Sequence, residues 1–268
     1  MDIEAPCGVC YVALNEFSDT QAITSATSLK RFMPELPITI FTDQDPTIHE
    51  QYNGCFDNIV KIPSQLDHPI IRSMPQYPEQ GITAKVRYMF SAPYERAIFM
   101  DVDTYILDEL WDMFQLLDNF DIALTHSCGH HANGLYQDVP QSFCVFSSGV
   151  VVYKRSKRMD KLFEHYWNLY VDATCKGWGF ADQMTLQKAL YDCKDIRIAT
   201  LPQEYNMPFD FPTYVWCKTK IIHGRPPDYY PIIENRINRP GEVNAPKVWY
   251  LGDPICIYLP YGVGLVKF

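Results

Sequence analysis

One segment limits the possible folds of this 268-residue chain more than any other: residues 97–103, with the sequence AIFMDVD. Its four apolar residues predict a buried strand, and two carboxylates follow. Side chains two residues apart in a strand point to the same face, so we expect Asp101 and Asp103 to lie side by side. Neighbouring carboxylates at the end of a buried strand need a cation or hydrogen-bond donors to offset their charge. The segment therefore predicts a divalent-cation site at the carboxyl edge of an α/β sheet.

A second Asp-x-Asp sequence shows that this spacing alone is not sufficient. Asp43 and Asp45 also follow an apolar run, residues 38–41, but Pro46 comes next. Aspartates in such a segment commonly accept hydrogen bonds from nearby backbone in a turn. We therefore interpret this second pair as structural, and the first pair needs support from other parts of the chain.

The alternation of apolar runs with helix signals predicts the fold class. Strands are expected at residues 10–14, 38–41, 58–62, 97–100, 122–124, 143–146, 150–153, 196–199 and 220–223, and helices at residues 18–32, 84–90, 109–117, 157–170 and 182–190. Strand, helix and strand at this spacing indicate a single α/β domain with a mostly parallel central sheet flanked by helices. Residues 147–149 are expected to form a bend between two strands, and the chain after residue 225 an irregular extension.

Composition excludes several classes of partner. The net charge is −9 and the pI about 5.2, which argues against nucleic acid, because binding to a phosphate backbone needs a basic surface. No apolar run approaches the roughly 18 residues of a transmembrane helix. The first residues lack the basic and apolar regions of a secretory signal. Nine scattered cysteines then indicate reduced thiols, and we expect a cytoplasmic protein, either free or peripheral to a membrane. Cys7-x-x-Cys10 has no second pair, which argues against a zinc site.

Several polar residues lie where a site could form. Lys85 precedes the central strand in a helix for which Thr83 is the expected N-cap, whereas Arg87 is expected on its solvated face. Asp182 follows a Gly-rich aromatic turn, and it either caps the next helix or belongs to a catalytic centre. The His- and Cys-containing residues 126–131 lack metal-ligand spacing and are expected to form a loop near the active site.

Together these motifs resemble the glycosyltransferases of the GT-A fold, and most of all the family-8 group, over residues 9–225. The matching segments are residues 11–15 with 28–30, Lys85, residues 99–104, 147–150, 182–183 and 202–206, and His223. Two departures leave the transferred sugar open. Ser147 stands where the group usually has Asn, and the segment after His223 lacks the usual lysine, for which Arg225 is a substitute.

The resemblance implies a site for a nucleoside diphosphate sugar, with UDP as the preferred nucleotide. The donor-binding residues that it implies are Ala13, Leu14, Asn15, Lys85, Asp101, Val102, Asp103, Ser147, Ser148, Gly149, Asp182, Gln183, Tyr205, Gly224 and Arg225. Asp101, Asp103 and His223 are the implied metal ligands, and this set suits Mn²⁺ better than Mg²⁺. Asp182 and Lys85 are the expected catalytic residues. Residues up to about 125 would bind the nucleotide, and the rest would bind the donor sugar and a glycan or other hydroxyl acceptor.

The reaction course and two rival functions stay open at this point. The resemblance favours retention of configuration, whereas Asp182 after the Trp178-Gly179 turn would suit an inverting enzyme with a carboxylate base. A haloacid-dehalogenase-type phosphatase would use Asp101 as nucleophile, although Tyr105 stands where that family has Thr. The other alternative is a non-catalytic sugar-binding module.

Overall fold

Seven strands form the central sheet of the computed structural model, which describes residues 5–45, 54–64, 66, 68, 80–127, 135–178, 181–224, 230–240 and 247–249. The strands are β1 (Ala5–Ala13), β2 (Ile38–Thr42), β3 (Asn58–Lys61), β4 (Tyr94–Met100), β6 (Ile122–His126), β7 (Phe146–Lys154) and β8 (Ile198–Thr200). Their order is β3-β2-β1-β4-β7-β6-β8. All neighbouring strands are parallel except β7, which runs antiparallel to both β4 and β6. The predicted mostly parallel α/β sheet is therefore confirmed.

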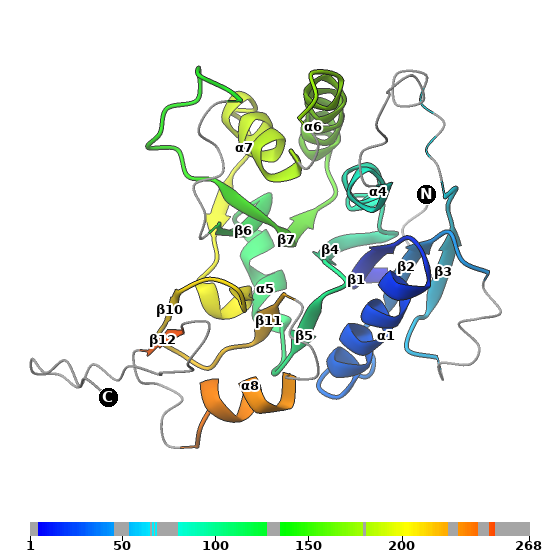
Figure 1. Cartoon of the computed structure of the whole chain (residues 1–268), viewed down its shortest axis with the longest axis vertical. Coiled ribbons are helices and arrows are strands. Elements are labelled where there is room, and N and C mark those ends of the chain that lie inside the picture. The colour runs from blue at the N-terminus through cyan, green and yellow to red at the C-terminus, as the bar shows by residue number, and fades with distance from the viewer. Residues whose placement is uncertain are drawn as a thin grey trace, which may run out of the picture.

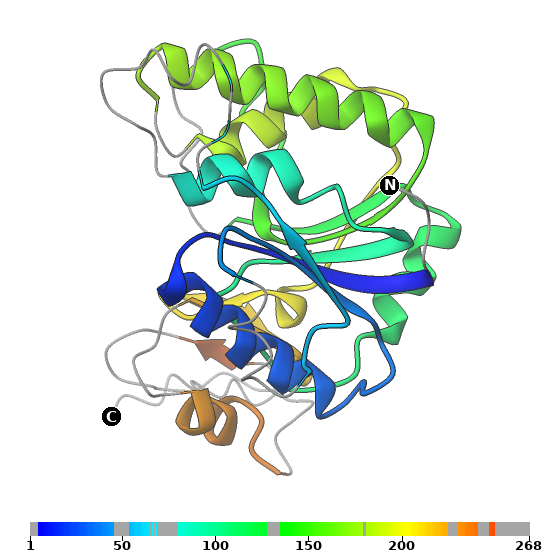
Figure 2. The same cartoon turned by 90° about the vertical axis from the view of Figure 1, so that its right-hand side faces the viewer.

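Helices cover both faces of this sheet (Figures 1 and 2). The described helices are α1 (Glu16–Lys30), α4 (Gln80–Tyr88), α5 (Trp111–Gln115), α6 (Lys157–Cys175), α7 (Asp182–Asp192) and α8 (Tyr230–Ile237), with short 3-10 turns at Leu116–Asp118 and Gln203–Tyr205. Helices α4, α6 and α7 lie on one face, and α1 and α5 on the other. Helix α6 begins as the sequence predicts, since Ser156 Oγ accepts the N–H of Met159. Among the described residues, no helix is long and apolar enough to cross a bilayer.

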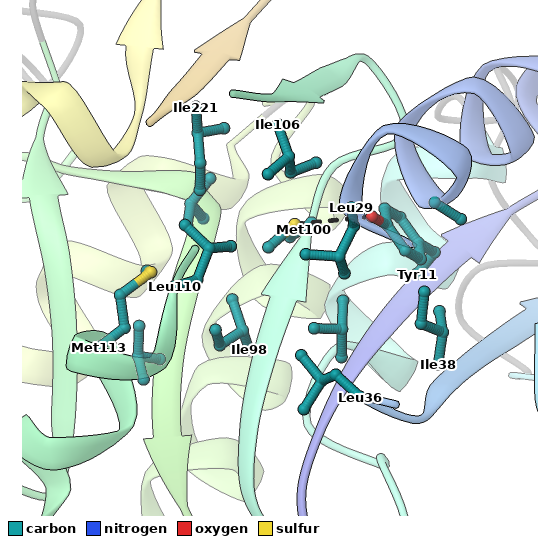
Figure 3. Close-up of a cluster of buried hydrophobic side chains, with 14 of the residues drawn as sticks. Tyr11, Leu29, Leu36, Ile38, Ile98, Met100, Ile106, Leu110, Met113 and Ile221 are labelled. Carbon is teal, nitrogen blue, oxygen red and sulfur yellow. Dashed lines mark hydrogen bonds between the residues drawn. The ribbon is translucent and has the colours of Figure 1, made fainter. Parts of the chain in front are cut away.

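The core on the α1 side joins β1 and α1 to elements from much later in the chain (Figure 3). Tyr11 of β1, Leu29 of α1 and Met100 of β4 are fully buried there. Ile221 packs into the same cluster from β11 (Ile221–His223). Burial of each such side chain contributes roughly 1.5–3 kcal/mol. This packing holds the end of β4 against a second, smaller sheet.

The second sheet has the order β5-β11-β9, in which β5 is Thr104–Ile106 and β9 is Met207–Pro208. Beside it β10 (Thr213–Val215) pairs with β12 (Lys247–Trp249) in antiparallel fashion. Ile233 and Ile237 of α8 are buried with Ile222 and Trp249 in a third cluster. We expected the chain after residue 225 to be irregular, and the presence of α8 and β12 there shows that this expectation was wrong. The spacing of Ile233 and Ile237 at i, i+4 was the available signal.

Two further expectations were wrong. Helix α4 begins at Gln80, so Thr83 lies inside the helix instead of capping it, and its hydroxyl shares a buried hydrogen bond with Tyr170. No bend occurs at residues 147–149, because β7 continues through Gly149 as one strand of nine residues. The first error came from taking a local capping residue as the helix start. The second came from local turn residues, whose preference is overridden by the pairing of β7 with β4 and β6.

Candidate functional site

The two aspartates of the first Asp-x-Asp sequence lie in a turn at the carboxyl edge of the large sheet. β4 ends at Met100, so Asp101 and Asp103 do not continue the strand as we expected. The turn is held by its backbone, since the N–H of Asp101 donates to the carbonyl of Gly149 at 2.7 Å. Thr104 Oγ1 donates to the carbonyl of Asp101 at 2.8 Å. The carboxylates are thus fixed by the turn rather than by strand alternation.

His223 joins these two carboxylates from the second sheet. The antiparallel pairing of β11 with β5 sets His223 opposite Thr104, directly after the turn. Its Nε2 lies 3.5 Å from Asp101 Oδ2 and 3.4 Å from Asp103 Oδ1. One ligand atom from each of the three residues lies within 4.8 Å of the others. Two carboxylates and an imidazole at this spacing form a suitable site for a divalent cation.

Gly149 and Gly224 make room for this cluster. A methyl group on Gly149 would overlap Cε1 of His223 and lie 2.7 Å from Nδ1, so only glycine fits against the imidazole ring. Gly224 has φ +130°, which favours glycine, and its N–H donates to the carbonyl of Asp103 at 2.9 Å. The two glycines therefore act behind the cluster, through backbone contacts with its ligands.

The charge state of His223 follows from its surroundings. Burial alone lowers the pKa of His223, but the charges of Asp103 and Asp101 and hydrogen bonds to both raise the pKa to about 10. Without a cation the imidazole is therefore protonated at neutral pH, and it pairs with the carboxylates. A bound cation would replace that proton, since metals bind the neutral imidazole.

Lys85 links this cluster to Asp182. Its Nζ donates to Asp101 Oδ2 at 2.8 Å and to Ser148 Oγ at 3.0 Å, and it lies 3.2 Å from Asp182 Oδ2. Burial lowers the pKa of Lys85, but the charges of Asp101 and Asp182 outweigh that effect and raise the pKa above its usual value. The ammonium group is therefore charged and held between two carboxylates.

Asp182 does not cap α7. The N-cap is Ala181, without a side-chain hydrogen bond, and Asp182 is the first residue of the helix. Its Oδ2 instead accepts the Ser148 hydroxyl at 2.7 Å. Because Ser148 and Gly149 are neighbours on β7, one strand contacts both Asp182 and His223. Since Asp182 is not the N-cap residue and its carboxylate binds Ser148, the alternative that it only caps α7 is excluded.

Other residues implied by the resemblance lie around this cluster. Ala13 and Leu14 are buried at the carboxyl end of β1, and Asn15 caps α1 through its side chain and has φ 76°. Val102 is partly buried and packs against the α1-side core. Oε1 of Gln183 is buried without a hydrogen-bond partner among the described residues, which leaves an acceptor for a ligand hydroxyl.

One implied residue, Tyr205, contacts other residues than those of the cluster. The Tyr205 hydroxyl donates to Asp112, and Lys220 Nζ lies 5.1 Å from the centre of the Tyr205 ring. Arg225 lies outside the described residues. Ser147 contacts Asn206, whose amide donates to Ser147 Oγ at 2.9 Å and to Thr125.

Some supporting residues were missed by the sequence analysis. Ser25 Oγ on α1 shares hydrogen bonds with Thr104 Oγ1 at 2.7 Å and with Tyr11 at 3.0 Å. This buried chain connects the first helix to the turn that carries both aspartates. Tyr166 of α6 is fully buried, and its hydroxyl has no hydrogen-bond partner among the described residues. Burial and the nearby charge of Asp182 raise the pKa of Tyr166. No local pattern indicates such contacts between distant elements.

The motifs interpreted as structural are structural. Asp43 Oδ1 accepts the backbone N–H of Asn15 at 2.8 Å and the side chain of Gln44. Cys7 and Cys10 pack into the cores on opposite faces of the sheet, so they cannot bind one ion. All seven described cysteines are free thiols. Of the loop at residues 126–131, only residues 126 and 127 are described.

Comparison with known proteins defines the fold. No protein-family model and no curated protein sequence matches the chain. Mouse xyloside xylosyltransferase 1, in its apo form, matches with a TM-score of 0.56 and 14% identity over 82% of this chain and 98% of that one. The galactosyltransferase LgtC, in complex with donor and acceptor sugar analogues, matches with a TM-score of 0.56 and 12% identity over 82% and 87%. The glycosyltransferase GlyE of Streptococcus pneumoniae matches with a TM-score of 0.55 and 17% identity over 82% and 55%. The chain therefore has the GT-A fold of these glycosyltransferases.

Proposed function

We propose that the chain is a metal-dependent glycosyltransferase that moves a sugar from a nucleoside diphosphate sugar to a hydroxyl group of a glycan or another acceptor. The convergence of Asp101, Asp103 and His223 at the carboxyl edge of β4, within a GT-A fold, carries the proposal. Ligands of open α/β sheets bind at this edge. UDP is the nucleotide that the motif resemblance favours.

The donor set indicates which cation would bind. Two carboxylates and one imidazole suit Mn²⁺, and Mg²⁺ is the alternative. A cation held by Asp101, Asp103 and His223 would stabilise the negative charge that develops on the departing diphosphate. Ala13, Leu14 and Asn15, at the end of the neighbouring strand β1, would face the nucleoside. The division into a nucleotide half and a donor-sugar half is part of the same proposal.

Lys85 and Asp182 would act on the donor sugar and its diphosphate. Lys85 supplies a buried positive charge beside the cation site. Asp182 Oδ2 accepts the Ser148 hydroxyl and pairs with Lys85, so this oxygen is already engaged. That arrangement suits a residue that positions donor hydroxyls better than a general base for the acceptor, and it favours retention of configuration. Gln183 would offer its unpartnered oxygen to the same sugar.

Thermal unfolding with ligands tests the proposal. A ligand that binds only the native state raises the melting temperature. UDP should stabilise the protein in the presence of Mn²⁺ and not in the presence of a chelator. Asp103→Ala should abolish this shift, whereas Asp172→Asn, on the exposed side of α6, should retain it.

The outcomes separate the alternatives. If no nucleoside diphosphate stabilises the protein under any metal condition, the proposed binding site for a nucleoside diphosphate sugar is refuted. Hydrolysis of an aryl phosphate that depends on Asp101 would then support the phosphatase alternative. If UDP-sugars bind but are neither hydrolysed nor transferred, the chain is a sugar-binding module.

A further inference from the structure

Two large aromatic side chains lie exposed on one side of the short strand β10 and its C-terminal continuation. Tyr214 is 48% exposed and Trp216 is 43% exposed, whereas Thr213 and Val215 between and beside them are buried. The two ring centroids are 6.2 Å apart with an interplanar angle of 55°. We call Tyr214 and Trp216 the β10 aromatic face. Adjacent exposed aromatic rings commonly mark a binding surface.

The backbone under these rings is anchored. Glu204 is only 5% exposed, and its Oε1 accepts the N–H groups of both Trp216 and Cys217. Tyr214 pairs with Val248 of β12. The rings are therefore presented by ordered backbone, so that a ligand would bind with little loss of conformational entropy.

The β10 aromatic face belongs to the same structural unit as the candidate cation site. The chain reaches β10 from Phe209, whose N–H donates to the carbonyl of His223 at 2.7 Å. Asp210 and the exposed Phe211 follow, and a methyl group on Gly224 would lie 3.7 Å from the Asp210 carboxylate. One continuous segment, residues 209–216, thus leads from a backbone contact with His223 to the two exposed rings.

The chemistry of this face indicates its ligand. Tyr and Trp rings combine a flat apolar face with a polar edge, which suits the apolar ring face and hydroxyl groups of a sugar. Neither the Tyr214 hydroxyl nor Trp216 Nε1 has a hydrogen-bond partner among the described residues. Lys218, the next basic residue, pairs with Asp108 at 3.2 Å. With a net charge of −9 and no free basic cluster beside the rings among the described residues, an anionic membrane is disfavoured.

We propose that the β10 aromatic face is an acceptor subsite that binds a neutral oligosaccharide by stacking on Tyr214 and Trp216. The inference rests on the proposed transferase function, because the β10 aromatic face would bind the acceptor of that reaction. It also makes a binding statement that can be tested without donor or metal.

The test uses the full chain labelled with 5-fluorotryptophan. Its ¹⁹F spectrum is recorded with short neutral oligosaccharides of glucose, galactose or xylose, and Trp216→Phe assigns the Trp216 signal. At least one oligosaccharide should shift this signal. Tyr214→Ser combined with Trp216→Ser should weaken binding of that oligosaccharide, measured by calorimetry, by about tenfold or more. Trp111→Ser, at an equally exposed tryptophan on α5, should bind as the wild type does.

Each result decides the inference. It is overturned if no oligosaccharide shifts the Trp216 signal, if binding survives the double substitution in a folded protein, or if phosphatidylserine vesicles shift the signal in place of sugars. UDP titration in the same samples separates the two proposals. UDP binding without oligosaccharide binding refutes only the subsite, and oligosaccharide binding without any nucleotide binding refutes the transferase and retains the sugar-binding face.

Discussion

The α-carbon of Gly149 on β7 lies against the imidazole ring of His223 on β11, with no space for a methyl group between them. Gly149→Ala must therefore displace His223 from the two carboxylates. We expect the affinity for Mn²⁺ to fall by about 10–100-fold. Calorimetric titration with Mn²⁺ measures this loss.

The matched control is Gly81→Ala in α4, where a methyl group would contact nothing within 4 Å. This variant should bind Mn²⁺ normally and should be neutral or more stable by up to about 1 kcal/mol, because alanine favours a helix over glycine. Normal Mn²⁺ affinity in Gly149→Ala would show that the imidazole is not a ligand.

Lys85 and Arg87 offer a second matched pair, since both are basic and both lie on α4. Lys85→Met leaves Asp101 and Asp182 without their shared counter-charge. We expect the free energy of unfolding to fall by about 2–4 kcal/mol without metal, and the transfer rate to fall by about 10²–10³-fold. Added Mn²⁺ should restore part of the stability, because a cation also compensates Asp101.

Arg87→Met should cost at most about 1 kcal/mol, since Arg87 is exposed and its guanidinium packs over the Trp167 ring. Denaturant unfolding of both variants, with chelator and with Mn²⁺, makes the comparison. Equal losses in the two variants would refute the special role of Lys85.

Metal affinity should depend on pH through His223. Its pKa of about 10 lies above the usual 6.5, so the imidazole carries a proton at neutral pH that must leave when a cation binds. The apparent affinity for Mn²⁺ should therefore rise with pH, by up to about tenfold per pH unit, and level off near the raised pKa. Calorimetry in buffers with different ionisation enthalpies measures the proton release, and a flat pH profile would contradict it.

The same raised pKa affects stability without metal. The contribution of protonated His223 to the free energy of unfolding is fully present below pH 6.5, and it is lost as the pH rises through about 10. Chelated wild-type protein should thus lose stability over this range relative to His223→Gln. Parallel unfolding curves of the two proteins across the range would exclude the effect.

Asp19 predicts a loss of stability in the same direction, but at a lower pH than His223. It is 2% exposed on α1, its carboxylate accepts the Thr42 hydroxyl, and burial raises its pKa to about 6. A carboxyl group with a raised folded pKa stabilises the protein at low pH and loses that contribution as the pH rises through about 6. Asp19→Asn should therefore raise stability at pH 7 by about 1–3 kcal/mol. The gain should vanish near pH 4, and its persistence there would indicate a different cause.

The large sheet was predictable because its strands are nearly uniformly apolar and are separated by turn residues. The α6 stripe and the cap at Ser156 follow from local rules that packing does not override. The continuous strand β7 was not predictable from residues 147–149, since Ser and Gly favour turns locally. The structure shows that Gly149 is required by the ring of His223, a residue far away in the sequence.

The sequence predicted which residues form the candidate site better than it predicted how they are held in place. Spacing and resemblance indicated Asp101, Asp103, His223, Lys85 and Asp182, and the structure brings these residues together. The turn after Met100 and the buried chain through Ser25 and Thr104 depend on tertiary contacts, which no local pattern specifies. Tyr205 was expected at the site from the resemblance of residues 202–206, and its hydroxyl bonds to Asp112 instead.

Because β7 runs antiparallel to β4 and β6, its first residues lie at the sheet edge where those neighbouring strands end. Its first residues, with Ser148 and Gly149, touch the candidate site, whereas its last residue, Lys154, lies at the opposite edge of the sheet and reaches the buried Asp121. A displacement of β7 along its own axis would therefore move the supports of Asp182 and His223 together. The position of this one strand therefore sets the distance between Asp182, proposed to contact the sugar, and His223, proposed to bind the cation.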